Sequence, residues 1–245
     1  MLQRLLFLAF LSFAGFASGV KAQVPPDAMS LFRNWLETQG ALAMRLTQVD
    51  FTEEVIRVVD NPFGTHEMVV ETAVSGSLRP DRWERTPLRV VVNGNLLPPD
   101  SWNNAERRWR TTSRADVNRL LEMVALPLRI LHAMRPAGPT QADEIDGVLL
   151  WRFEVIPADT SPIERITLWM DRRTGHLRQS RAIIRAGQVE TPVLINITYE
   201  RVQGLDVPRV RTIEATVQRK RRMRLYTTLL TTEATYRNYR FVFRR

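Results

Sequence analysis

The sequence contains no cysteine among its 245 residues. Disulfides, thiol catalysis, cysteine-based metal sites and a lipid anchor on an N-terminal cysteine are therefore excluded. Lysine is scarce too, because Lys21 and Lys220 are the only two in the sequence and arginine supplies the other basic residues. This bias indicates the base composition of a genome more than a dedicated arginine surface.

Motifs for catalysis or metal binding are also missing. The three histidines, His66, His132 and His176, lie far apart, and none has a metal-ligand spacing. The sequence has no nucleophile elbow, phosphate-binding loop or dinucleotide fingerprint. We therefore expect a protein that is not an enzyme, with no catalytic residues, cofactor or metal. A hydrolase with a site scattered over several strands is the enzymatic alternative, and substitutions at His66 or His176 would test it.

The first residues have the pattern of an export signal. Arg4 precedes an apolar run, Leu5–Ala17, and small residues up to Ala22 offer cleavage sites. We expect a signal peptide over residues 1–22, cleaved near Ala22, and a single domain over residues 23–245. The signal is of bacterial type, which predicts the periplasm. An uncleaved N-terminal membrane anchor is the alternative.

The positive charge is concentrated at the C-terminal end. The formal net charge is +9, and nine basic residues but one acid lie between Arg219 and the end. A protein that coats nucleic acid would be cationic throughout, so we expect no nucleic-acid partner. The densest run is either a solvated hairpin tip that guards a sheet edge or a basic docking rim for a membrane surface. This rim consists of Arg219, Lys220, Arg221, Arg222 and Arg224.

The hydrophobic periodicity predicts the order helix, strands, helices, strands. A helix is expected over Pro25–Gln48, with Asp27 as its N-cap after two prolines. Strands are expected over residues 49–59, 68–78 and 88–92, the last ending at an Asn-Gly turn. Helical patterns then fill the middle of the chain up to Pro136. The acids Asp143, Glu144 and Asp146 are expected in a solvated loop.

The clearest strand pair lies between Glu164 and Arg185. Apolar and polar residues alternate on both sides of a turn over Asp171–Gly175. Further strands are expected over residues 192–201, 210–218 and 225–236, with a loop over Gly204–Pro208. The fold class is therefore α+β, mainly β: a large curved antiparallel sheet, an incomplete β-barrel. The N-terminal helix and the mid-chain helical insertion would act as its lid.

A curved sheet with a helix over its concave side can enclose a hydrophobic cavity. The strands that follow residue 145 carry more large apolar side chains than a one-sided sheet needs. The candidate cavity residues are Trp151, Phe153, Leu168, Met170, Ile195, Ile197 and Tyr199.

Several strings resemble those of the outer-membrane lipoprotein-sorting family, the LolA/LolB-like carriers. They are GSLRPDRW (76–83), LRVVVNG (88–94), LWMDRRTGHLRQSR (168–181), ITYERVQGLDVPR (197–209) and TYRNYRF (235–241). The resemblance covers roughly residues 26 to 243. It implies an incomplete barrel that holds acyl chains under a helical lid and moves lipoproteins or related lipids across the periplasm without a cofactor. The chain departs from the LolB-like pattern in lacking a cysteine for an anchor, which implies a soluble carrier.

These observations predict a periplasmic carrier or binding protein for lipoproteins or other lipids. Its partners would be the cargo and a membrane or envelope protein at which it docks. The alternative is an envelope sensor or protein-interaction domain that uses the same fold.

Overall fold

The structure of the protein is a computed structural model. It describes residues 25–78, 81–102, 104, 134–157, 163–185, 192–221 and 224–244. The predicted signal peptide and most of the predicted mid-chain helical insertion lie outside the described residues, as does His132.

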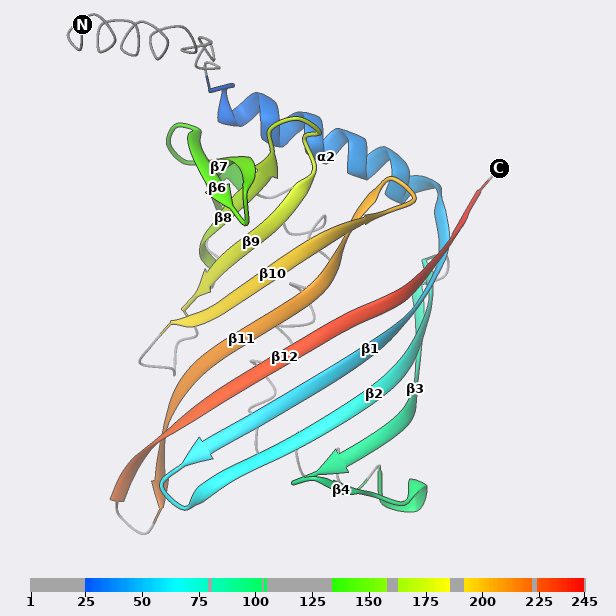
Figure 1. The fold of residues 1–245 in the computed structure, drawn as a ribbon, viewed down its shortest axis with the longest axis vertical. Coiled ribbons are helices and arrows are strands. Elements are labelled where there is room, and N and C mark those ends of the chain that lie inside the picture. The colour runs from blue at the N-terminus through cyan, green and yellow to red at the C-terminus, as the bar shows by residue number, and fades with distance from the viewer. Residues whose placement is uncertain are drawn as a thin grey trace, which may run out of the picture.

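One long helix and one large sheet make up most of the described chain (Figure 1). The helix is α2 (Ala28–Arg45). The strands are β1 (Leu46–Asn61), β2 (Gly64–Leu78), β3 (Asp81–Val92), β4 (Asn95–Leu96), β5 (Met134–Pro136), β6 (Gln141–Ile145), β7 (Val148–Pro157), β8 (Ile163–Asp171), β9 (Leu177–Ile184), β10 (Val193–Val202), β11 (Leu205–Arg221) and β12 (Arg224–Phe243).

The sheet is antiparallel and open. Its twelve strands follow the order β4-β3-β2-β1-β12-β11-β10-β9-β8-β7-β5, with β6 also paired to β7. The first and last long strands, β1 and β12, therefore lie side by side in the middle of the sheet (Figure 1). The predicted fold class is confirmed: a mainly β chain with a curved, unclosed sheet and an N-terminal helix. The predicted hairpin is also confirmed, as β8 and β9.

The two faces of the sheet differ in chemistry. Cross-strand partners such as Phe153 and Leu168, or Ile195 and Ile213, are buried and point to the same side because side chains alternate along a strand. We call this side, which packs against α2, the inner face. On the outer face of the β1–β3 region, charged residues form ion pairs, for example Arg89 with Glu54 at 2.9 Å.

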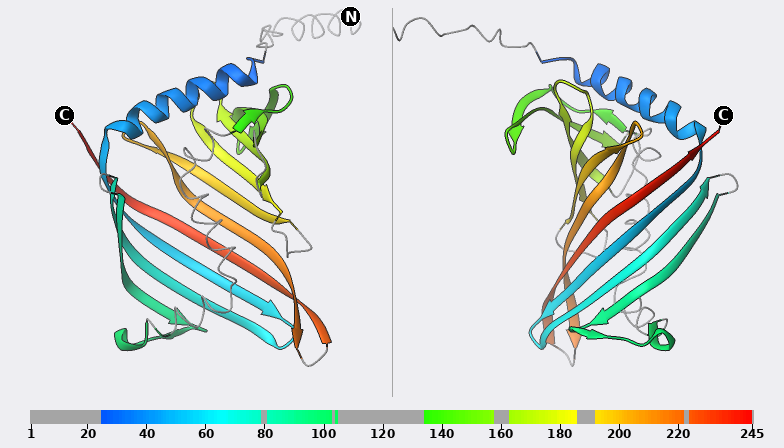
Figure 2. Two further views of the ribbon diagram at one scale, coloured as in Figure 1. Left: turned by 180° about the vertical axis from the view of Figure 1, so that it is seen from behind. Right: turned by 45° about the vertical axis from the view of Figure 1, so that its right-hand side comes forward.

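Helix α2 begins and ends where its sequence dictates. Two prolines precede Asp27, whose carboxylate accepts the N–H of Ser30 at 2.9 Å, so the predicted N-cap is confirmed. The buried residues Ala28, Phe32, Trp35 and Gln39 follow helical spacing and form one stripe. After Arg45 the chain enters β1, three residues earlier than the sequence predicted. The helix lies across one end of the sheet (Figures 1 and 2).

Two loops predicted from the sequence are strands instead. The predicted loop over Gly204–Pro208 was wrong, because Gln203 and Gly204 make a tight turn with φ of 50° and 90° and β11 begins at Leu205. Pro208 is tolerated there because a register shift between β10 and β11 lies at this point.

The prediction of a solvated acidic loop was also wrong in part. Asp143 and Glu144 lie in β6, and only Asp146 lies in the turn that follows, with φ of 51°. The outward-facing Asp143 accepts a hydrogen bond from the indole N–H of Trp169 at 2.9 Å. This bond lowers the pKa of Asp143 below its ordinary value.

Candidate functional site: the inner face and its helix

The seven candidate cavity residues all lie on buried positions of β7, β8 and β10. Six of them belong to one apolar cluster with α2, namely Phe153, Leu168, Met170, Ile195, Ile197 and Tyr199. Each exposes 6% of its surface or less. The structure thus brings these six together, where they pack against one another and against the helix.

Trp151 is buried but lies at the margin of this cluster. The guanidinium of Arg172 sits over its ring, with Cζ 4.1 Å from the ring centroid. The same arginine donates from Nε to the Leu150 carbonyl oxygen at 3.1 Å. Trp151 therefore borders the apolar face at a point where a cation covers it.

Helix α2 covers the inner face with aromatic side chains. The ring of Phe32 meets that of Phe153 edge to face, with centroids 6.2 Å apart. Trp35 is 5% exposed and lies one further turn along the same stripe. The helix therefore occupies apolar surface that would otherwise be open to another apolar group.

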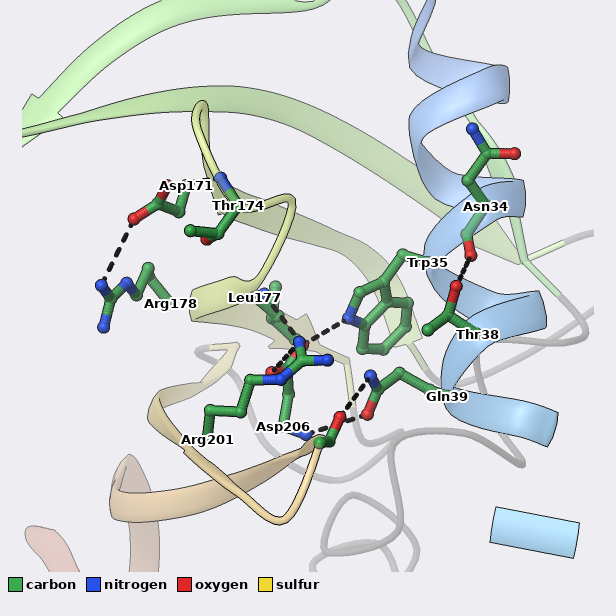
Figure 3. Close-up of polar contacts among 11 residues, drawn as sticks. Asn34, Trp35, Thr38, Gln39, Asp171, Thr174, Leu177, Arg178, Arg201 and Asp206 are labelled. Atoms are coloured by element: carbon green, nitrogen blue, oxygen red, sulfur yellow. Dashed lines mark hydrogen bonds and ion pairs between the residues drawn. The ribbon is translucent and has the colours of Figure 1, made fainter. Parts of the chain in front are cut away.

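A buried carboxylate, Asp206, ties the helix to the sheet (Figure 3). Its Oδ2 accepts the indole N–H of Trp35 at 2.9 Å and the backbone N–H of Leu177 at 3.1 Å. Its Oδ1 lies 3.3 Å from Nη1 of Arg201, with which it forms an ion pair. The Asp206 side chain is 1% exposed, so hydrogen bonds from these groups replace those that its carboxylate would make with water.

Gln39 makes the second polar connection between α2 and the sheet. Its side-chain oxygen accepts the backbone N–H of Asp206 at 2.9 Å, and its side-chain nitrogen donates to the Gly204 carbonyl at 3.3 Å (Figure 3). A Cβ at Gly204 would lie 3.3 Å from Leu42 on the helix, and its φ of 90° is the left-handed region. Glycine therefore lets the β10–β11 turn approach α2 closely. We call Trp35, Gln39 and Asp206 the helix latch.

The β8–β9 turn lies next to the latch. Asp171 Oδ1 accepts the backbone N–H groups of Arg173 and Thr174 at 3.0 and 2.9 Å. Burial opposes ionisation of Asp171, but these hydrogen bonds outweigh it and lower its pKa. Desolvation, and then the positive charge of Arg201, lower the pKa of His176 in the same turn.

A polar cluster interrupts the inner face on β1, β12 and β11, and a side chain from β3 reaches it across β2. Glu53 and Arg211 are buried, with Oε1 and Nη2 3.7 Å apart. Arg85, which is half-exposed, lies 3.6 Å from the other oxygen of Glu53. The Arg211 guanidinium lies over the ring of Tyr236, Cζ being 5.7 Å from the centroid, and burial raises the pKa of this tyrosine. The inner face thus carries buried charge beside its apolar part.

Two open hollows lie along β1–β4 and β12. One, of about 640 Å³, is lined by residues that include Leu88, Leu96 and Trp102. The other, of about 370 Å³, is polar at Asp50 and Arg240. Within the ranges described, no group of histidine and acidic side chains could hold a metal ion. No helix in those ranges is long and apolar enough to cross a membrane.

The basic run lies at the other end of the sheet from α2. Strand β11 ends at Arg221, β12 begins at Arg224, and Arg219 pairs with Tyr226. Of the predicted docking rim, Arg222 lies outside the described residues, and the backbone alone is described for Arg219, Lys220, Arg221 and Arg224. The rim therefore marks the tip of the β11–β12 hairpin (Figure 1).

The latch and the buried ion pair were not predicted from the sequence. Glu53 and Arg211 each take an inward position in an otherwise apolar alternation, such as Phe51, Glu53, Val55. A charged residue at an inward position is a signal that could have found both. Asp206 follows a Gln-Gly turn and looks like any turn acid, so nothing in the sequence distinguished it.

The described part of the chain is thus an open antiparallel sheet whose apolar inner face is covered at one end by a helix. No family model matches the sequence, and no curated protein matches it. Solved structures do match. A DUF1329 family protein from Desulfovibrio piger shares 10% identity and a TM-score of 0.39, over 88% of this chain and 94% of its own.

A putative outer-membrane lipoprotein-sorting protein domain from Vibrio parahaemolyticus shares 11% identity and a TM-score of 0.39, over 86% of this chain and 93% of its own. The MucA/MucB complex structure from Pseudomonas aeruginosa shares 12% identity and a TM-score of 0.22, over 84% and 98%. The resemblance predicted from the sequence is confirmed, because a lipoprotein-sorting protein domain is among the matching structures.

Proposed function

We propose that the protein is a non-enzymatic carrier or binding protein of the periplasm, which holds the acyl chains of lipoproteins or other lipids against the inner face. The observation that carries this proposal is the packing of α2 on a broad apolar surface. An acyl chain has the same chemistry as the side chains that α2 contributes, so it can take their place when the helix moves away.

The helix latch supports a lid that opens and closes. Three polar residues connect α2 to the sheet in a place where neither partner is exposed to water. Loss of a few hydrogen bonds and of the Phe32 and Trp35 contacts would free the helix, whereas the ladder hydrogen bonds of the strands would remain. The six clustered residues predicted for the cavity would then become the surface that meets the ligand, with Trp151 at its margin.

The polar cluster suggests where the head of an amphiphile would lie. Arg211 and Arg85 carry positive charge beside the apolar surface, and Glu53 partly neutralises it. An anionic headgroup placed near the half-exposed Arg85 would gain a charge-assisted hydrogen bond at little desolvation cost. The cargo class that fits is therefore an anionic or zwitterionic lipid, free or attached to a protein.

Native mass spectrometry of protein purified from its own periplasm tests the proposal. We expect co-purified lipid, and uptake of a fluorescent acyl probe by the delipidated protein. A Leu168→Glu substitution should abolish uptake, whereas Leu149→Glu, at a site 54% exposed, should not. Absence of bound lipid together with absence of probe uptake would contradict the proposal.

A protein-interaction role is the second candidate, and the edge of β3 favours it. Within the described ranges, β4 pairs only with Val91 and Val92, so most of the outer edge of β3 has no strand beside it. Such an edge can accept an extended peptide as a further strand. A specific protein retained without lipid, with hydrogen-exchange protection at β3, would support this role over the carrier.

A further inference from the structure

The end of the sheet opposite α2 exposes large apolar side chains. Phe63, in the β1–β2 turn, is 63% exposed, and its ring meets that of Tyr226 with centroids 5.4 Å apart. Leu225 and Leu229 of β12 are 70% and 44% exposed. We call these four residues the tip patch. Tyr226 points to the opposite face of β12 from Leu225 and Leu229, because side chains alternate along a strand. Two hairpins that are far apart in the sequence therefore expose apolar groups at the same end of the sheet, on both of its faces.

The β11–β12 hairpin projects at this end. The last partner of β1 on β12 is Leu229, opposite Asp60. Beyond it, β12 pairs with β11 alone as far as Arg224, in the described part of the chain. The views in Figures 1 and 2 agree that this hairpin and the β1–β2 turn reach the same end of the molecule. The tip patch thus lies at the end of the sheet opposite α2.

The chain at this tip is strongly basic. Arg219, Lys220, Arg221 and Arg224 lie in its strand ends, and no acid occurs between Glu214 and Glu233. Asp60 is the acid nearest in register, because it pairs with Leu229. The tip therefore combines positive charge with exposed aromatic and aliphatic groups.

We propose that this tip docks on a lipid bilayer with anionic headgroups. Positive charge alone would suit any polyanion, and apolar groups alone would suit another protein or a neutral membrane. The combination suits the bilayer interface, where rings and leucines lie at the headgroup level and cations meet lipid phosphates. Docking here leaves α2 at the far end of strands roughly 60 Å long, at about 3.3 Å per residue, so the lid stays free to move.

The test uses the full mature chain and vesicles of phosphatidylcholine with and without phosphatidylglycerol. We expect sedimentation with the anionic vesicles only, weakened by added salt. Replacing Arg219, Lys220, Arg221 and Arg224 by glutamine should weaken binding by about a hundredfold or more, since each cation near an anionic surface contributes about a factor of five. The matched control replaces four exposed arginines remote from the tip by glutamine: Arg33, Arg173, Arg209 and Arg244. It should retain most of the binding.

A second measurement locates the contact. Because the chain has no cysteine, Phe63→Cys and Val242→Cys each give one site for an environment-sensitive fluorophore. Val242 is 49% exposed and lies near α2, so it is the control position. The label at position 63 should brighten and shift to the blue with anionic vesicles, and the label at 242 should not.

Three results would overturn the proposal: equal loss of binding in both arginine variants, a response at position 242 but not at 63, or equal affinity for vesicles and a soluble polyanion such as heparin. The proposal does not depend on lipid carriage. Uptake of the acyl probe by the tip variants reports the carrier function separately, so either one can fail alone.

Discussion

Replacing Asp206 by asparagine removes the charge of the helix latch while keeping the size of the side chain. The amide oxygen can still accept from Trp35 and Leu177, as Oδ2 does at 2.9 and 3.1 Å. Its NH₂ group then faces Arg201, and the ion pair is lost. Two charge-assisted hydrogen bonds become neutral and one is broken, which costs about 2–3 kcal/mol for a side chain that is 1% exposed.

Part of this cost falls on α2 itself. If the substitution destabilises the closed position of α2 by about 1.4 kcal/mol, the population of molecules with an open helix rises about tenfold. Hydrogen exchange measured by mass spectrometry should then be faster in peptides from residues 28–45 and unchanged in β1 and β12. Uptake of the acyl probe should be faster as well, because the inner face is exposed more often.

Thr38→Val is the matched control on the same helix. Thr38 is exposed and donates to the Asn34 carbonyl at 2.8 Å within α2 (Figure 3). Its loss should change exchange in α2 by less than about twofold, as expected for an exposed position.

A double-mutant cycle with Trp35→Phe isolates the bond between helix and sheet. The coupling free energy between Trp35→Phe and Asp206→Asn should be about 1 kcal/mol. Purely additive effects, or faster exchange in the whole sheet rather than in α2, would refute the latch.

The remaining predictions concern stability. Phe153→Ala should lower the free energy of unfolding, measured with urea, by about 3–5 kcal/mol, and Leu149→Ala by less than about 0.5 kcal/mol, because Phe153 is 2% and Leu149 54% exposed. Asp171→Asn should destabilise at neutral pH by about 1–2 kcal/mol. The pKa of Asp171 is lowered by folding, so this difference should persist above the ordinary pKa of 3.8 and vanish as the pH falls through the folded value; a constant difference would contradict it. The pKa of His176 is also lowered by folding, so its protonation favours the unfolded state. Wild type should lose stability as the pH falls below 6.5, and His176→Gln should lose less; parallel profiles would contradict this.

The sequence predicted the strands well because their signal is local. The alternation of Ile166, Leu168 and Met170 with polar neighbours specifies both the strand and the face that is buried. The Asn93-Gly94 turn, with φ of 48° and 79°, likewise follows from the two residues that form it.

The candidate site was predicted less completely because its polar parts depend on distant partners. Trp35 and Asp206 are 171 residues apart, and Glu53 meets Arg211 across the junction of the two halves of the sheet. The pattern around each residue indicates only whether it faces inward. Which residue it meets is determined by the order of the strands, and neither composition nor spacing specifies that order.

The pairing of β1 with β12 affects how the molecule is made. These strands join residues such as Val49 and Phe241, from the two ends of the described chain, in the centre of the sheet. In the described part of the chain, β12 is the strand that joins the β1–β3 strands to the β7–β11 strands, so without it each set would have an unpaired edge. Phe32 and Trp35 of α2 also have their partners, Phe153 and Asp206, much further along the chain.

Contacts of such long sequence separation make folding slow and leave edges exposed to aggregation. The sheet can therefore form completely only when β12 is present. Deletion of β12 would divide the sheet at its centre and remove the strand that joins β1 to β11.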